Sequence, residues 1–443
     1  VAYWHYIGYL CKEDHEEAER LFEQITSPEG LLWKKFYRAC MESISGNPDK
    51  AMTLRQELLQ ELPEGAKMRA NIYAAIGDDL NYDNTKITEQ ATWYEKALQV
   101  VPNFYVQKHL AILYFRYPEL GKKPEDALRL WEGAWHAGVW SAANFLGYNY
   151  QDDPWTNYPK AIEWLEKGML YCESYSAYEL ALIYLYNENY QNIERGLYCL
   201  QRCVEDGYAQ GIVSLAMVYF NGELVEKNVE RSHELLLKAS ELGSGEAAYR
   251  IGWMYENSIF TEAPDYQKAL EYFEKAAERE DTSGLCRAAL YLANGYAGVT
   301  DPVKSKEYYE KAAEQNAPYA LVELGFLQEN EQSYQQAFEL FKKAAVQEYP
   351  YGMFRVGYYL SEGILGDAQP EEGAKWYTKA AEAGDSDAMF FLGKCYKVGY
   401  GIEENPDKAL EWFQKGAEEN EPRCITELGL AYENGIGVEE NPH

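Results

Sequence analysis

The chain has 443 residues, a mass of 50.9 kDa and a formal charge of −31, since 41 Lys and Arg stand against 72 Asp and Glu. One hydrophobic core rarely grows past roughly 250–300 residues, so we expect several domains or a core that extends in one direction. Hydrophobic residues make up 47% of the chain, which excludes a wholly disordered protein, and no apolar run approaches the roughly 20 residues that cross a bilayer. A surface this acidic repels phosphate backbones and anionic lipids, so we expect no nucleic acid partner and no direct membrane binding.

The first seventy residues are predicted to be helical without a strict repeat. The small residues that mark later units are blurred here, and the expected helices cover residues 3–10, 18–25, 32–43 and 51–62. The sequence opens at Val1 without a Met and stops at His443 inside an unfinished unit. We therefore expect it to be a segment of a longer protein.

From about residue 70 one pattern recurs, and we call its segment helix A. A small residue is followed five positions later by Gly or Ala, and often three further on by Tyr, as in Ala142, Gly147 and Tyr150. The Gly or Ala is the marker of the repeat and recurs every 32 to 37 residues, at Gly77, Ala111, Gly147, Ala181, Ala216, Gly252, Ala288, Gly325, Gly357, Gly393 and Gly429. Positions in helix A are counted from this marker.

A second pattern, helix B, lies between successive A helices. A small residue is followed at +3 and +4 by large apolar residues, at +6 by Lys and at +7 by another small residue, as from Ala269 to Ala276. The positions 0, +3, +4 and +7 form one stripe on an α-helix, so each repeat is predicted to be an antiparallel helix pair. Small residues at the crossing points allow close approach of the two helices. Length varies only between A and B, where glycines such as Gly399 and Gly401 can take the positive φ that ends a helix.

These paired patterns resemble the Sel-1-like repeats, relatives of the tetratricopeptide repeat. Residues 392–417 are close to a consensus unit, and the pattern recurs about ten times. The resemblance implies an all-α, right-handed superhelical solenoid of about twelve antiparallel helix pairs. We expect looser tetratricopeptide-like hairpins in 1–69 and tandem Sel-1-like repeats in 70–443, with an incomplete last repeat. One unit departs from the pattern, because only twelve residues separate Gly325 from Ala337, as in the shorter tetratricopeptide form.

No residue pattern predicts catalysis, a cofactor or a metal. The six histidines lack metal-binding or nucleophile-activating spacing, and no nucleophile elbow or phosphate loop occurs. The glycines of residues 242–246 are expected to form a turn between helices. The eight cysteines have no repeating interval and are expected to be free thiols, and Cys199 and Cys203 fit packing better than zinc binding. Relatives linked to enzymatic activity have paired cysteines in each repeat, which this chain lacks, so we expect a protein that is not an enzyme.

The recurrent Lys at +6 of helix B is the nearest approach to a basic motif. It lies near the C-terminal end of the helix, where a cation complements the helix dipole, so we interpret it as structural rather than as a ligand site. The residues are Lys96, Lys167, Lys238, Lys275, Lys311, Lys343, Lys379 and Lys415.

The chain has 40 Tyr and 11 Trp, more than a core of this size needs. Tyr at +3 of helix A and both large residues of helix B fall on the predicted core stripe. In tetratricopeptide-like arrays the A helices line the concave surface, and the resemblance implies that positions −3, +1 and +4 point into it. These positions predict a peptide-binding groove formed by Asn144, Tyr148, Tyr178, Tyr249, Trp253, Phe326, Phe354, Tyr358 and Phe390. The alternative for the −3 residues is packing between neighbouring A helices, and the sequence does not decide between the two.

The predicted function is that of a non-catalytic scaffold or adaptor, as in Sel-1-like relatives, which mostly assemble other proteins in bacterial envelopes, in signalling and in eukaryotic quality control. The aromatic residues would anchor a peptide or protein segment, Asn144 would offer backbone hydrogen bonds, and the acidic rim would attract Lys or Arg of the partner. Two alternatives are a hydrolase acting on cell-wall fragments and a structural targeting arm of a longer protein. The sequence leaves the compartment open: the absence of glycosylation sequons favours the cytoplasm, and a bacterial envelope remains an alternative.

Overall fold

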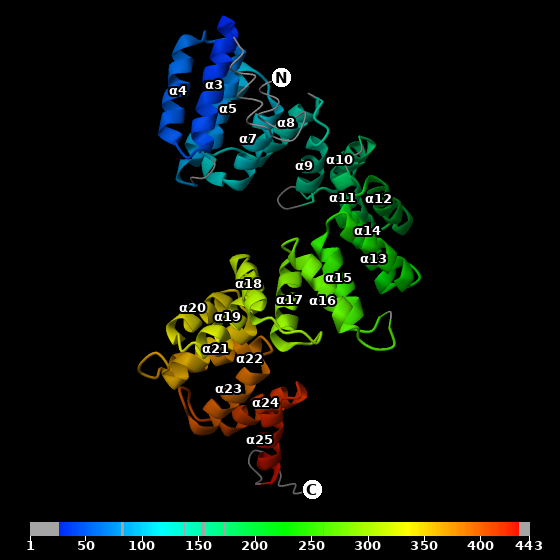
Figure 1. Ribbon diagram of the computed structural model, residues 1–443, viewed down its shortest axis with the longest axis vertical. Helices are drawn as coiled ribbons and strands as arrows, with labels where there is room; N and C mark the ends of the chain where they lie inside the picture. Colours follow the sequence, from blue (N-terminus) through cyan, green and yellow to red (C-terminus); the bar gives the residue numbers. More distant parts are fainter. Residues whose placement is uncertain are drawn as a thin grey trace. The chain divides into compact units, whose positions relative to one another are not determined.

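The computed structural model describes residues 26–80, 84–136, 138–151, 156–171, 174–259 and 261–433. Within these ranges the regular elements are twenty-three α-helices, α3 to α25, and two short 3-10 helices, and there is no strand (Figure 1). The helices expected at 3–10 and 18–25 lie outside the described residues. The predicted all-α class is confirmed.

The helices alternate between the two predicted patterns. The A helices are α5 (Lys67–Asp79), α7 (Phe104–Arg116), α9 (Ala142–Asn149), α11 (Ser174–Tyr186), α13 (Ala209–Asn221), α15 (Gly245–Glu256), α17 (Thr282–Asn294), α19 (Pro318–Asn330), α21 (Pro350–Glu362), α23 (Ser386–Val398) and α25 (Pro422–Glu433). The B helices are α6 (Ile87–Val100), α8 (Pro124–His136), α10 (Tyr158–Leu170), α12 (Ile193–Asp206), α14 (Val229–Glu241), α16 (Tyr266–Ala277), α18 (Pro302–Glu314), α20 (Tyr334–Val346), α22 (Pro370–Glu382) and α24 (Pro406–Glu418). A further pair, α3 (Pro28–Ile44) and α4 (Pro48–Glu61), precedes them, and the 3-10 helices are η1 (Asn84–Lys86) and η2 (Pro118–Leu120). The described residues thus hold eleven pairs and a final A helix, in keeping with the predicted solenoid of about twelve pairs.

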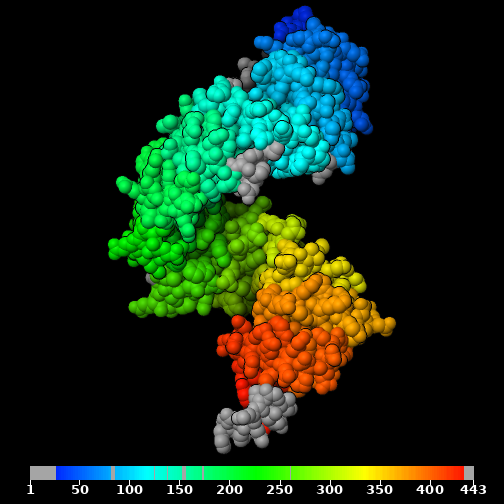
Figure 2. Space-filling model, turned by 180° about the vertical axis from the view of Figure 1, so that it is seen from behind, coloured from blue at the N-terminus to red at the C-terminus, as the bar shows by residue number. Residues whose placement is uncertain are grey.

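The chain divides into two compact units, residues 1–208 and 209–443. In each unit an A helix packs against its own B helix, and that B helix packs against the next A helix. Neighbouring A helices also contact each other, as α9 and α11 do in the first unit and α15 and α17 in the second. The side chains of successive repeats are packed together along each unit (Figure 2). Each unit therefore presents a face built from adjacent A helices, whereas the predicted boundary near residue 70 stays a prediction.

Marker glycines fix how closely the two helices of a repeat approach. A Cβ on Gly252 of α15 would lie 2.7 Å from the ring of Phe273 in α16, and one on Gly77 would lie 2.6 Å from the ring of Tyr94. Real Cβ atoms do not come this close, so the aromatic at +4 of helix B takes the space of the missing side chain. The small-residue periodicity therefore reports a direct helix–helix contact.

Glycines end helices and polar caps begin the next ones where the sequence predicted turns. Gly399 and Gly401 adopt φ of 68° and 71° after α23, as expected. In the segment 242–246, Gly243 has φ 95° and Ser244 caps α15 by accepting a hydrogen bond from the backbone N–H of Ala247 at 3.1 Å. The predicted turn in this segment is confirmed.

Five of the lysines at +6 of helix B stack on an aromatic ring of their own helix. The Nζ of Lys415 lies 4.2 Å from the ring centroid of Trp412 and 2.8 Å from the carboxylate of Glu411. Trp412 is half-buried, whereas Phe413, the next residue, is 3% exposed. Both aromatics therefore contact the core, as predicted, but Trp412 is only partly buried and its ring also supports a lysine at the surface. The same stack recurs at Lys96, Lys167, Lys275 and Lys379. In α18 both members of the aromatic pair, Tyr308 and Tyr309, are buried.

The described cysteines are free thiols, as predicted. Cys199 and Cys203 are 2% and 0% exposed, and burial raises their pKa values to about 11 and about 12. Neutral buried thiols of this kind pack as small apolar groups. The predictions for Cys11 and Cys172 lie outside the described residues.

Candidate interaction surface

The nine predicted groove residues all lie on A helices, and they fall in both units. The first unit holds Asn144 and Tyr148 on α9 and Tyr178 on α11. The second holds the other six: Tyr249 and Trp253 on α15, Phe326 on α19, Phe354 and Tyr358 on α21, and Phe390 on α23. The predicted residues therefore form two separate sets, one in each unit.

Trp253 lines a recess of about 190 Å³ between α13, α14 and α15. Its half-buried ring meets Phe220 of α13 edge-on, with ring centroids 5.9 Å apart and planes at 78°. The other walls are Met217, Leu236, Tyr249, Arg250 and Met254. Aromatic and thioether groups of this kind adapt to apolar side chains of varied shape.

A second recess of about 330 Å³ adjoins the first, because Tyr249 lines both. It lies over the A helices α15, α17 and α19, and its other walls are Thr282, Ser283, Cys286, Arg287, Leu290 and Tyr319. The two recesses together cross α13, α15, α17 and α19, and we call them the A-helix trough. Of the nine predicted residues, Tyr249 and Trp253 line it.

The arginines at the edge of the trough are paired within the protein. A guanidinium nitrogen of Arg250 lies 2.7 Å from the carboxylate of Glu246, and one of Arg287 lies 3.1 Å from that of Glu256. The hydroxyl of Tyr291 also donates to Glu256, at 2.9 Å. The arginines therefore border the trough with balanced charge and alkyl stems rather than as an anion site.

Predicted residues on α19, α21 and α23 instead form a cluster under the chain's own cations, which we call the arginine-covered cluster. The Cζ atom of Arg355 lies 4.9 Å from the ring centroid of Phe326 and 5.4 Å from that of Tyr358. Arg355 also forms an ion pair with Glu329, and the two side chains are 15% and 19% exposed. Arg423 covers Phe390 in the same manner, with its Cζ atom 4.6 Å from the ring centroid. These rings thus already hold a cation on one face.

Phe354 is buried rather than part of a groove. It is 5% exposed, and its ring centroid lies 5.9 Å from that of Tyr377 and 5.4 Å from that of Phe391. The cause is the close approach of α22, because a Cβ on Gly357 would lie 2.9 Å from the Tyr377 ring. At this repeat the −3 residue therefore packs between helices, which is the alternative that the sequence left open. The −3 residues Val213, Leu285 and Val322 are buried too.

In the first unit the predicted residues lie on α9 and α11, two A helices that contact each other. Tyr148 is 46% exposed, and the ring of Tyr178 lies 5.9 Å from that of Tyr208. The amide oxygen of Asn144 accepts a hydrogen bond from the hydroxyl of Ser176, so this oxygen connects the two helices. A role of Asn144 towards a bound peptide stays a prediction.

The sequence analysis missed several walls of the trough. Phe220 stands at +4 of α13, a position that we expected to face the groove but did not search for aromatics. Cys286 and Tyr319 stand at −2 and −6, positions that we did not consider. Comparing −6 and −2 across all repeats would have found them.

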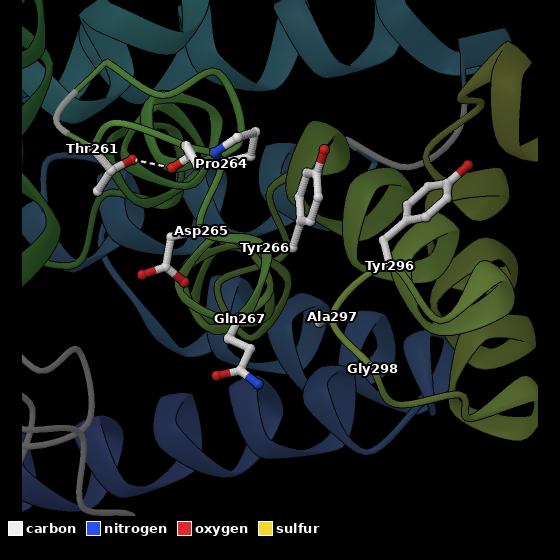
Figure 3. Close-up of a pocket in the computed structure, with 9 residues that line it drawn as sticks. Thr261, Pro264, Asp265, Tyr266, Gln267, Tyr296, Ala297 and Gly298 are labelled. Atoms are coloured by element: carbon white, nitrogen blue, oxygen red, sulfur yellow. Dashed lines mark hydrogen bonds between the residues drawn. The ribbon is translucent and has the colours of Figure 1, made fainter.

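A third recess, of about 530 Å³, lies between two A-to-B loops and is shown in Figure 3. The rings of Tyr266 and Tyr296 point to one side of it, and the side chains of Asp265 and Gln267 point away from them (Figure 3). The carboxylate of Asp265 caps α16, accepting from the backbone N–H of Lys268 at 3.0 Å. The polar side chains of this recess therefore stabilise the loops and do not converge on a common point.

Among the described residues no three His, Cys, Asp or Glu side chains are grouped in a way that could hold a metal ion. No helix in the described part of the chain is both long enough and apolar enough to cross a membrane.

The pattern of helices and markers agrees with a known family. The model of the Sel1 repeat matches residues 1–25, 140–168, 174–208, 209–244, 245–281, 282–316, 318–347, 350–385, 386–421 and 422–443. The chain belongs to the Sel1 repeat family. Sel1 repeat proteins are generally protein-interaction scaffolds, and their fold is typical of non-enzymatic proteins.

Two curated relatives and one solved structure are similar to this Sel1 repeat chain. Chitin synthase regulatory factor 4 of Schizosaccharomyces pombe is 26% identical over 141 residues, 31% of this chain and 22% of that protein. Chitin synthase regulatory factor 3 of the same organism is 24% identical over 181 residues, 38% of this chain and 19% of that protein. The alignments thus span about a fifth of the length of these relatives.

The solved structure is that of c5321, a protective antigen of uropathogenic Escherichia coli strains with an SLR fold. It is 22% identical, with a TM-score of 0.57, over 94% of this chain and 90% of that one. This likeness supports the fold alone.

Proposed function

We propose that this Sel1 repeat protein is a non-catalytic scaffold that binds a peptide or protein segment in the A-helix trough. The observation that carries the proposal is the pair of recesses that meet at Tyr249 and cross four consecutive A helices. Concave sites lined by aromatic and apolar side chains are the usual form of binding sites, and Trp and Tyr are frequent anchors of protein interfaces.

The shape and charge of the trough suit a particular kind of partner. Recesses of about 190 and 330 Å³ are of a size to receive single large side chains of a bound segment rather than a folded domain. The formal charge of −31 favours the approach of a basic segment, since opposite charge accelerates association. We therefore expect a segment with apolar anchor residues near Lys or Arg.

The names of the curated relatives support a role that is exercised on another protein. Both are named as regulatory factors of an enzyme, chitin synthase. A repeat array that docks a segment of its target would provide such regulation without a reaction of its own.

The test is selection of peptides from a display library on the full chain, followed by affinity measurements on variants. The variant Met217→Ala with Trp253→Ala removes two walls of the first recess and should weaken the selected peptides at least about ten-fold. Tyr334→Ala is the matched control, because Tyr334 is 44% exposed on B helix α20, away from the trough. Far-UV circular dichroism checks that all variants keep their helices. Unchanged affinity in the Met217 and Trp253 variant would overturn the proposal.

A further inference from the structure

Charged residues at position −2 of the A helices differ in whether the chain supplies their counter-ion. The residues are Glu179, Arg250, Glu323, Arg355 and Glu427. Arg250 and Arg355 pair with Glu246 and Glu329, and Glu427 pairs with Lys397 at 2.7 Å. Within the described part of the chain, no cation forms an ion pair with Glu179 or Glu323.

Glu323 of α19 lies beside the second recess of the trough. Tyr319, one helical turn earlier, and Cys286 of α17 both line that recess, and the charge of Glu323 acts on the pKa of each. The negative charge of Glu323 also raises the pKa of Tyr349, the residue that precedes α21. Burial raises the pKa of Glu323 above its ordinary value, and the interaction with the Tyr319 hydroxyl opposes this rise.

A buried phenol adds to this site. Tyr309 of α18 is 2% exposed, and its ring centroid lies 6.2 Å from that of Tyr319. Its hydroxyl interacts with that of Tyr319, and the charge of Glu323 raises its pKa. Two phenol groups therefore lie within electrostatic range of Glu323.

Glu179 of α11 occupies the equivalent place in the first unit. Tyr175 precedes it by one turn, as Tyr319 precedes Glu323, and Tyr208 stands eight residues before the following marker, as Tyr349 does. Glu179 is 8% exposed and accepts a hydrogen bond from the Nε2 of Gln151 at 3.3 Å. Burial and Glu179 raise the pKa of Tyr175, and Tyr208 contributes to the same rise.

In the arginine-covered cluster, a comparable set of one carboxylate and several aromatic rings contains a cation of the chain itself. There the carboxylate of Glu329 and the rings of Phe326 and Tyr358 surround the guanidinium of Arg355. At Glu179 and Glu323 the carboxylate and the rings are present without such a cation. A carboxylate held out of water without a counter-ion is unfavourable, and carboxylate with aromatic faces is the combination that binds ammonium and guanidinium groups.

We propose that Glu179 and Glu323 are two equivalent acceptor sites for Lys or Arg side chains of a protein partner, one site in each unit. The inference rests on the proposed function and specifies the chemistry of the partner. The bound segment carries a basic residue for each site, and in the second unit that residue lies next to the apolar anchor in the trough. Removing one site should leave the other intact.

The test uses the full chain with 15N-labelled tyrosine and Nα-acetyl-arginine amide as the probe. Amide signals of Tyr175 and Tyr319, assigned through Phe variants, report the two sites. The probe should shift both signals with an affinity at least about ten-fold higher than its neutral isostere Nα-acetyl-citrulline amide. Glu179→Gln should abolish the response of Tyr175 alone, and Glu323→Gln that of Tyr319 alone. Glu427→Gln is the matched control, at the same repeat position but paired with Lys397, and should change neither.

Equal responses to the two probes, no response at either site, or Gln variants that respond like the parent would overturn the inference. Thermal unfolding of each Gln variant shows that it is folded. Trp253→Ala separates this inference from the proposed function, because Trp253 lines the first recess and not the second. This variant should lose selected peptides while keeping the arginine response. Peptides that bind in the trough with equal affinity to the parent and to both Gln variants would refute the acceptor sites and leave the scaffold function standing.

Discussion

The A-helix trough and the arginine-covered cluster carry aromatic residues at the same repeat positions, yet the rings line recesses in the trough and are covered by arginine in the cluster. In the trough, Trp253 and Tyr249 line recesses, and the nearby Arg250 pairs within its own helix with Glu246. In the cluster, Arg355 pairs instead with Glu329 of the preceding A helix and so crosses the ring of Phe326. The ion-pair partner of the arginine at position −2 therefore distinguishes Trp253, which lines a recess, from Phe326, which is covered by Arg355.

The largest expected effect is the difference in stability between a variant that lacks a core aromatic and a variant that lacks a trough aromatic. Phe354→Ala removes a ring that is 5% exposed and should lower the free energy of unfolding by about 3–5 kcal/mol. Trp253→Ala removes a half-buried ring beside an existing recess and should cost about 1–2 kcal/mol. Urea denaturation followed by circular dichroism measures both. An equal cost for the two variants would contradict the distinction between cluster and trough.

Replacing Arg355 of the cluster should lower the free energy of unfolding more than replacing Arg250 of the trough. Arg355→Met removes the cationic partner of Glu329 in a site where both side chains are less than one-fifth exposed, and should cost about 3 kcal/mol. Arg250→Met breaks an i,i+4 pair whose side chains are both 34% exposed, and should cost about 0.5 kcal/mol. The difference in denaturation midpoint between these variants is the measurement. If Arg250→Met proved the more harmful, the covering role of Arg355 would be wrong.

A smaller effect should appear in the pH dependence of stability. Asp385 caps α23 in the cluster by accepting from the backbone N–H of Ala388 at 2.7 Å, and burial raises its pKa from 3.8 to about 6. Asp387 and Glu421 add to the rise, whereas the Ala388 hydrogen bond and Arg423 oppose it. Because the folded pKa exceeds the unfolded value, the stability linked to the bound proton is complete below about pH 3.8 and is lost as the pH rises through about 6.

Asp385→Asn keeps the capping oxygen without the charge. It should therefore be more stable than the parent by about 1 kcal/mol at pH 7 and equal to it below pH 4. Asp281 caps α17 beside the trough, and burial raises its pKa in the same direction, so Asp281→Asn should show a gain of the same sign. Urea midpoints at pH 4 and pH 7 measure the effect. A gain that is independent of pH would mean that the titration assigned to these caps is absent.

The repeat itself was predictable because its signals are local. A marker such as Gly252 and the aromatic Phe273 report one contact within a helix pair, so their spacing alone predicts the pair. The surface was less predictable because it depends on contacts between repeats. The burial of Phe354 requires Tyr377 and Phe391 from two other helices, and the position of Arg355 requires Glu329, 26 residues earlier.

The stacks on the B helices bear on how such an array can grow. In each stack the lysine and the aromatic ring belong to one helix, and in α16 the paired glutamate does too, as Lys275, Tyr272 and Glu271 show. A duplicated repeat therefore carries these surface contacts within its own helix and needs no new contact from the neighbouring repeats. Internal duplication during evolution can lengthen this protein without disturbing its exterior, while divergence at position −2 gives each added repeat its own capacity for recognition.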